Sequence, residues 1–97
     1  MKLENWRKEI DSIDAQLVGL LDRRAQIARE IGALKAAAGL PVVDPLREDE
    51  ILRKLAANNQ GILKNEAIIG IFRGIIRASR QIQIETQAKI SSGERVL

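Results

Sequence analysis

Polar side chains interrupt the apolar stripes of the sequence at three points, and these residues are the first candidates for chemistry. Arg24 stands in a repeat of apolar residues at alternating spacings of three and four, and Ser79 and Gln83 stand in a second stripe. Buried polar groups need hydrogen-bond partners, and a buried charge needs an opposite charge. Taken singly, Arg24 could pair with a structural carboxylate, and Ser79 and Gln83 could bind backbone groups or water. Taken together, the three residues indicate a polar pocket.

Further charged residues are expected to line the same pocket. Lys35 follows Arg24 by eleven residues, so the two cations lie on one helix face, about 16 Å apart along the axis. Asp44, Arg47 and Glu48 lie at positions i, i+3 and i+4, on one side of a second helix. Arginine offers forked donors to carboxylates, and lysine offers a mobile positive charge. Several cations and few acids in an apolar interior predict a pocket for a small dianion.

The residue types that are absent narrow the chemistry. The 97 residues include no cysteine, no histidine and no tyrosine. Disulfides, thiolate nucleophiles and zinc–thiolate sites are therefore excluded. Histidine, the commonest general base and metal ligand, is also unavailable. We expect neither a cofactor nor a metal ion.

The net charge of +3 and the pI of about 9.7 raise the question of nucleic acid. However, 13 acidic residues are interleaved with the basic ones, and aromatic residues for base stacking make up only 2% of the chain. A mild positive balance fits an anionic small molecule equally well, so no nucleic-acid partner is expected. No apolar run approaches about 18 residues, and the charged N-terminus lacks a signal-type segment. We expect a cytoplasmic protein that does not enter a membrane.

Three helices must position these residues, and no strand pattern is present, so the predicted fold class is all-α. The helices are expected at about residues 3–38, 45–57 and 65–90, within a single domain covering residues 1–97. The third helix has an inner stripe that begins apolar and becomes polar: Ile68, Phe72, Ile75, Ile76, Ser79, Ile82, Gln83 and Thr86.

Local signals mark the end of the first helix and the start of the second. Gly39 is a natural residue to end the first helix, and Pro41 follows shortly after it. Asp44 and Pro45 suit the N-cap and the first position of the second helix. The second helix offers four apolar residues for burial: Leu46, Ile51, Leu52 and Leu55.

The first helix is too long for a compact chain of this size. It would measure roughly 54 Å, whereas a globule of this length is about 25–30 Å across. Its apolar repeat is a heptad seam, typical of helices that pack along one another, and comprises Leu3, Trp6, Ile10, Ile13, Leu17, Leu20, Ile27, Ile31 and Leu34. We therefore expect an oligomer in which a second copy covers this seam.

Arg7 gives a geometric clue to that oligomer. It lies 17 residues before Arg24, about 25 Å along the helix and too far away to share a small ligand. In an antiparallel two-fold pair centred near residue 19, Arg7 faces roughly residues 29 to 33 of the partner. That stretch lies between Arg24 and Lys35, so we expect Arg7 to serve the pocket of the other subunit.

Four segments, in order, give the chain a family resemblance: residues 20–24 (LLDRR), 31–35 (IGALK), 43–48 (VDPLRE) and 71–79 (IFRGIIRAS). The chain resembles the all-helical chorismate mutases, which occur alone and within bifunctional enzymes of aromatic biosynthesis. The likeness extends from Trp6 to about Gln87. It implies an intertwined homodimer that rearranges chorismate to prephenate for phenylalanine and tyrosine biosynthesis, without cofactor. A fusion or complex with another enzyme of the pathway is also consistent with it.

The resemblance implies roles at the reacting end of the substrate. Arg24, together with Arg7 of the partner subunit, would hold the substrate carboxylates. Lys35 would contact a carboxylate and the ether oxygen, and Gln83 would donate to the same ether oxygen. The implied reaction is pericyclic and forms no covalent intermediate, so a chain without histidine, cysteine or tyrosine suits it.

The resemblance also implies roles at the ring. Glu48 would accept a hydrogen bond from the ring hydroxyl, with Asp44 and Arg47 supporting that end. Ser79 would lie near the ring carboxylate.

Two other functions compete with this interpretation. Elimination of pyruvate from isochorismate uses the same fold, but the intact segment from Asp44 to Glu48 resembles the mutases more closely. A non-catalytic helical dimerisation or regulatory module is the other alternative. Such a module would be expected to lose the pocket cations, which this chain retains.

Overall fold

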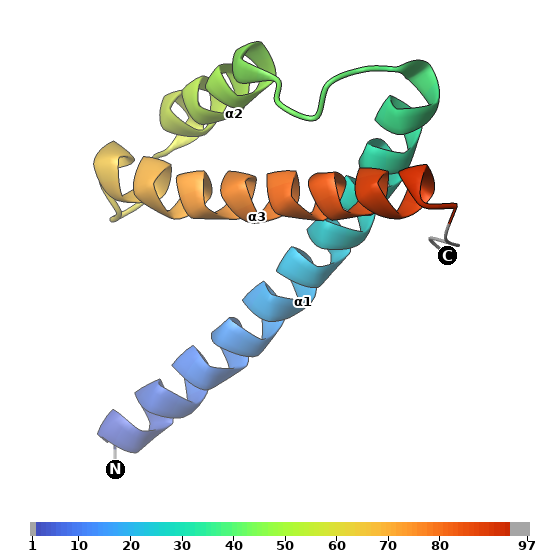
Figure 1. Ribbon diagram of the computed structural model, residues 1–97. Coiled ribbons are helices and arrows are strands. Elements are labelled where there is room, and N and C mark those ends of the chain that lie inside the picture. The colour runs from blue at the N-terminus through green and yellow to red at the C-terminus, as the bar shows by residue number, and fades with distance from the viewer. Residues whose placement is uncertain (1, 94–97) are drawn as a thin grey trace.

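The computed structural model describes residues 2–93 and consists of three α-helices, with no strand in this part of the chain (Figure 1). Helix α1 spans Lys2–Ala38, α2 spans Pro45–Asn58 and α3 spans Asn65–Ser91. The all-α prediction is confirmed, and each predicted helix end lies within one residue of the observed end. The predicted domain of residues 1–97 extends beyond the described residues at both termini.

The connection from α1 to α2 follows the local signals in the sequence. Gly39 has a φ of +68°, which a glycine adopts without steric cost. The Leu40 N–H donates to the Lys35 carbonyl at 2.8 Å, and the Gly39 N–H to the Ala36 carbonyl at 3.3 Å. These two bonds form a Schellman motif that ends α1. Asp44 then caps α2 by accepting the Arg47 backbone N–H at 3.1 Å.

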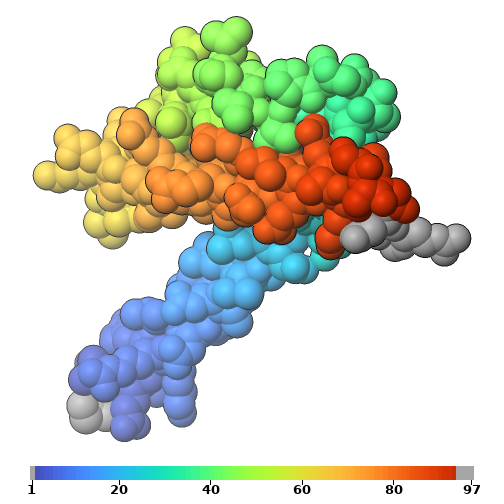
Figure 2. Space-filling model, viewed as in Figure 1, coloured from blue at the N-terminus to red at the C-terminus, as the bar shows by residue number. Residues whose placement is uncertain are grey.

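Helix α3 crosses the C-terminal half of α1, and α2 packs along the N-terminal half of α3, on the same side as the C-terminal end of α1 (Figure 1). The N-terminal half of α1 projects away from the other helices (Figure 2). The molecule therefore measures 56 × 29 × 14 Å, with a radius of gyration of 16.9 Å, against about 13 Å for a compact chain of this length. Among residues 2–93, no helix is both long and apolar enough to cross a membrane.

Gly32 allows α1 and α3 to approach closely at their crossing. A Cβ atom at this position would lie 3.0 Å from the Gln83 Cα, and 3.3 Å from the Gln83 Cβ and carbonyl oxygen. These distances are shorter than ordinary van der Waals contacts. The helical glycine, which costs about 1 kcal/mol relative to alanine, therefore sets the position of Gln83 against α1.

The core of the single chain is small. Only four described residues are buried: Ala28, Gly32, Ile76 and Thr86. The inner stripe expected on α3 is confirmed, because all of its residues are buried or half-buried. The expectation that Leu46 is available for burial is wrong, since it is 84% exposed. At about 100° per residue it lies on the opposite side of α2 from Leu55, which faces inward.

The heptad seam of α1 is largely uncovered in the single chain. Its members between Leu3 and Leu20 are 47–64% exposed, including Trp6 at 64%. Such a contiguous apolar face is unusual on a monomeric protein surface.

Candidate active site

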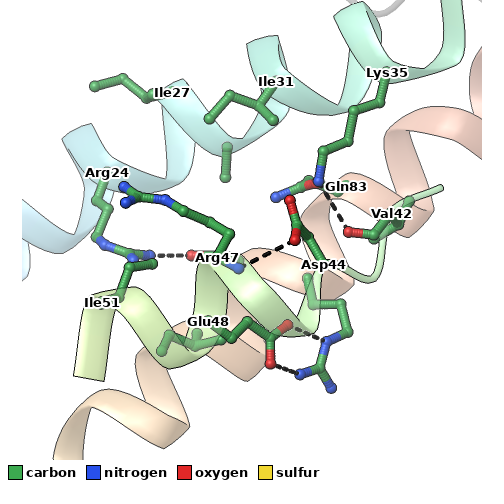
Figure 3. Close-up of a pocket in the computed structure, with 14 residues that line it drawn as sticks. Arg24, Ile27, Ile31, Lys35, Val42, Asp44, Arg47, Glu48, Ile51 and Gln83 are labelled. Atoms are coloured by element: carbon green, nitrogen blue, oxygen red, sulfur yellow. Dashed lines mark hydrogen bonds and ion pairs between the residues drawn. The ribbon is translucent and has the colours of Figure 1, made fainter. Parts of the chain in front are cut away.

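The three helices enclose a pocket of about 360 Å³ between the C-terminal half of α1, the start of α2 and the middle of α3 (Figure 3). All seven polar residues that the sequence suggested for a single chain line it: Arg24, Lys35, Asp44, Arg47, Glu48, Ser79 and Gln83. The structure thus brings together residues that are up to 59 positions apart in the sequence.

Apolar side chains complete the pocket wall. Ile27, Ala28 and Ile31 come from α1, Ile51 from α2 and Ile76 from α3. From the sequence, these residues are expected at most in packing seams, and none of them in the pocket. Their presence lowers the local polarity, and electrostatic interactions with a bound ligand are stronger in such surroundings than in water.

Arg24 carries a positive charge that the described residues do not neutralise. Its Nη1 donates to the Ser79 hydroxyl oxygen, and no ion pair joins it to a carboxylate within residues 2–93. The structural carboxylate that could have explained an arginine in the seam is therefore absent from this region. A guanidinium of this kind is suited to bind an anion.

Lys35 and Gln83 form a second pair of donors. The Lys35 Nζ donates to the Val42 carbonyl oxygen and to the Gln83 Oε1, each at 2.9 Å. Because the amide oxygen of Gln83 accepts from Lys35, the amide nitrogen retains its two N–H donors for a ligand. The lysine ammonium also has a third N–H group. The pocket therefore offers donors from two helices, α1 and α3, side by side (Figure 3).

Glu48 is held by Arg80, a residue that is not among the site residues predicted from the sequence. Arg80 donates from Nη2 to the Glu48 Oε1 at 2.6 Å and from Nε to the Oε2 at 3.2 Å, and both side chains are half-buried. Asp44 and Arg47 were expected to support this end of the site, but neither side chain bonds to Glu48. A signal for Arg80 was present, because it lies between Ile76 and Gln83 at spacings of four and three on the inner side of α3.

Arg47 pairs within its own helix. Its Nη1 lies 2.5 Å from the Glu50 Oε1, and both side chains are roughly half exposed. The hydrogen bond from Arg47, followed by that from Lys54, lowers the pKa of the Glu50 carboxyl. Asp44 acts as the N-cap of α2. Arg47 and Asp44 therefore line the pocket while making their own bonds within the start of α2.

The charge of the pocket suits an anionic ligand. Four cationic residues line it (Arg24, Lys35, Arg47 and Arg80), against two acidic residues (Asp44 and Glu48), which leaves a net charge of +2. Arg7 is not among the lining residues. It is exposed on the projecting half of α1, so the single chain does not bring it to the pocket.

Comparison with known proteins agrees with this geometry. A sequence model of the family described as chorismate mutase type II matches residues 6–84. The chain is 38% identical over 94 residues to the bifunctional chorismate mutase/prephenate dehydratase of Aquifex aeolicus (strain VF5), covering 93% of this chain and 25% of that protein. It thus spans about a quarter of the length of this relative.

Shorter relatives are matched over most of their length. The chorismate mutase of Methanocaldococcus jannaschii is 32% identical, with 84% of each chain covered. The crystal structure of a chorismate mutase from Helicobacter pylori in complex with prephenate superposes with a TM-score of 0.82 at 36% identity, covering 90% of this chain and 94% of that one. The chain therefore belongs to the type II chorismate mutase family.

Proposed function

We propose that this chain rearranges chorismate to prephenate in the pocket between its three helices. The observation that carries the proposal is the gathering of four cations and the Gln83 amide around one cavity of about 360 Å³. This volume lies in the range of small-molecule sites, roughly 300–1,000 Å³. Chorismate is a dicarboxylate, so the net positive charge of the pocket complements it.

The chemistry matches the side chains that are available. In the rearrangement a C–O bond breaks while a C–C bond forms within one molecule, without a nucleophile or a proton transfer. The site must hold the substrate in a compact conformation and stabilise the negative charge that develops on the ether oxygen. Arg24 holds a carboxylate, while Lys35 and the Gln83 N–H groups donate to the ether oxygen. Positioning and electrostatic stabilisation together supply the barrier reduction, on the order of 8 kcal/mol.

The ring end of the substrate meets Glu48 and Ser79. Glu48 accepts the hydrogen bond of the ring hydroxyl, and Ser79, which already accepts from Arg24, lies near the ring carboxylate. Asp44 and Arg47 flank this end from the start of α2.

The active form is an antiparallel homodimer in which each pocket receives Arg7 from the other chain. The exposed apolar seam of α1 supports this part of the proposal. With a two-fold axis near Gly19, Arg7 of one chain lies opposite Ile31 of the other, and Ile31 lines the pocket. The same packing that covers the seam therefore adds a further cation to each site.

The reaction belongs to phenylalanine and tyrosine biosynthesis, and a cytoplasmic location stays a prediction from the sequence. The relative in Aquifex aeolicus is named as a chorismate mutase joined to a prephenate dehydratase. We accordingly propose that this chain either works alone or acts with a second enzyme of the pathway, in a fusion or a complex.

A chorismate assay tests the proposal. We expect the purified protein to consume chorismate, followed by ultraviolet absorbance, and to yield prephenate. Arg24→Ala and Lys35→Ala should each reduce kcat/KM by about 100-fold or more, the size expected for loss of a charge that stabilises the transition state. Arg53→Ala removes an exposed arginine on α2, outside the pocket, and should leave turnover unchanged.

Two results would contradict the proposal. One is release of pyruvate from isochorismate with no turnover of chorismate, which would identify the lyase activity instead. The other is the absence of any turnover in a correctly folded dimer, which would favour a regulatory module.

A further inference from the structure

The ion pair between Arg80 and Glu48 differs from the other ion pairs of the described residues. The others lie within α2 and are exposed at the helix surface. The pair of Arg80 and Glu48 joins α3 to α2, is 34% and 27% exposed, and lines the pocket. A fork of two hydrogen bonds between a guanidinium and a carboxylate restricts the orientation of both groups.

The proposed role of Glu48 creates an electrostatic problem that Arg80 can solve. A carboxylate that accepts a hydrogen bond from the substrate stands in the same pocket as two substrate carboxylates, and like charges repel at short range. An adjacent guanidinium cancels the charge of Glu48 without protonating it. The carboxylate can then remain an acceptor next to a dianion.

The geometry leaves Glu48 able to accept from a ligand. A carboxylate has about four lone-pair positions, and Arg80 occupies one on each oxygen, at 2.6 and 3.2 Å. Each oxygen therefore keeps a free lone pair. Because both oxygens are bonded to a single rigid group, the plane of the carboxylate is set by Arg80, and with it the direction of the remaining lone pairs.

We propose that Arg80 is a positioning residue that aims the Glu48 carboxylate at the substrate hydroxyl and thereby sets the selectivity for substrates that carry this hydroxyl. The inference rests on the proposed function of the pocket. Arg80 acts through Glu48 and does not bind the substrate itself. Its removal should therefore affect a hydroxylated substrate more than an analogue without the hydroxyl.

The test compares chorismate with the analogue in which hydrogen replaces the ring hydroxyl. The quantity measured is the ratio of kcat/KM for the two substrates, in the wild type and in Arg80→Leu, Arg80→Lys and Glu48→Ala. Arg80→Leu should reduce this ratio by roughly 10-fold, the size of one hydrogen bond to a charged acceptor at a partly exposed site. Arg80→Lys keeps the charge but not the fork, and should give an intermediate ratio.

The combination of Arg80→Leu with Glu48→Ala shows whether Arg80 acts through Glu48. The double variant should have the same substrate ratio as Glu48→Ala alone, because the acceptor that Arg80 orients is already missing. Arg53→Leu is the matched control, since Arg53 forms an ion pair with Asp49 at 2.9 Å that lies outside the pocket. It should leave both rates unchanged. Circular dichroism and gel filtration verify that each variant folds and assembles as the wild type does.

Two outcomes would overturn the inference alone. If Arg80→Leu lowers kcat/KM for both substrates by the same factor, Arg80 contributes charge or binds a substrate carboxylate and does not position Glu48. If the ratio falls further in the double variant than in Glu48→Ala, Arg80 recognises the hydroxyl independently. A wild-type protein that turns over neither substrate would instead refute the proposed function on which the inference rests.

Discussion

At the scale of residues, the proposed function makes Gln83 a hydrogen-bond donor that does not depend on pH. Its amide oxygen accepts from the Lys35 Nζ at 2.9 Å, which leaves the N–H groups for the substrate. A glutamine has no titratable group in the working range. The chain also has no histidine, so the commonest source of a pH-dependent rate near neutrality is missing.

We therefore expect the activity of the wild type to be nearly constant between about pH 6 and 8. Gln83→Glu should be active only under acidic conditions, because the introduced carboxyl donates a hydrogen bond only when it is protonated. The neighbouring Lys35 ammonium favours the ionised carboxylate and lowers its pKa, so kcat/KM should still be rising as the pH falls to about 5. The measurement is kcat/KM as a function of pH for both proteins. A steep acid optimum in the wild type would contradict the role of Gln83.

The sequence predicts many of the site residues, but it does not predict how their charged side chains pair. Residues that break an apolar stripe, such as Arg24, Ser79 and Gln83, could be found from their positions alone, and all of them line the pocket. The partners of the charged side chains could not be found in this way. Glu48 pairs with Arg80, 32 residues later, and this choice depends on how α2 packs against α3.

At the scale of elements, the crossing of α1 and α3 controls the position of the donors. Gly32 lies close against α3 at this crossing, and a Cβ atom there would meet the backbone and Cβ of Gln83. A side chain at position 32 would push against the backbone of α3, which cannot move aside as a flexible side chain can. The glycine thus connects the packing of two helices to the geometry of the site.

Gly32→Ala should therefore reduce kcat/KM by about 10-fold, because the Gln83 backbone must shift by a few tenths of an ångström, and a misplacement of about 1 Å can cost about 100-fold. Alanine has a higher helix propensity than glycine, which should offset part of the packing strain. The melting temperature should therefore change little, although the activity falls. Gly70→Ala is the control, since a Cβ at Gly70 meets no atom within 4 Å. Unchanged activity in Gly32→Ala would show that Gln83 does not require this close contact.

Helix boundaries are the part of the fold that the sequence predicts best. Gly39 and the Asp44–Pro45 pair act within a few residues, and their hydrogen bonds are those expected of a C-terminal motif and an N-cap. The orientation of α2 is less accessible, as the exposed Leu46 shows. A short helix that packs only on α3 buries one face, and that face depends on contacts distant in sequence.

At the scale of the whole molecule, the exposed seam is the dominant feature. A helix of 37 residues projects beyond the part of the chain that covers it, with Trp6, Ile10 and Ile13 each more than half exposed. Burying this face against a second copy removes apolar surface from water, which favours association. The shape of the molecule thus supports the dimer of the proposed function, in addition to the needs of the site.

Ile13→Lys should separate the dimer, because it places a charge within the apolar seam. We expect gel filtration with light scattering to report a monomer or a greatly weakened dimer. Chorismate turnover should fall by about 100-fold or more, since each pocket then lacks the cation from the other chain. Leu46→Lys introduces the same residue at an exposed apolar position on α2 and should remain an active dimer. A monomeric Ile13→Lys variant with full activity would show that one chain suffices.

Complementation between Arg7→Ala and Arg24→Ala tests whether chorismate is rearranged in a pocket that two chains share. Each variant carries a different tag, and the heterodimer is purified through both. The two homodimers should each lose nearly all chorismate mutase activity. In the heterodimer one pocket collects both lesions and the other has none, so its activity should return to about half that of the wild type. A heterodimer as inactive as its parents, or an Arg7→Ala homodimer with full activity, would contradict the shared site.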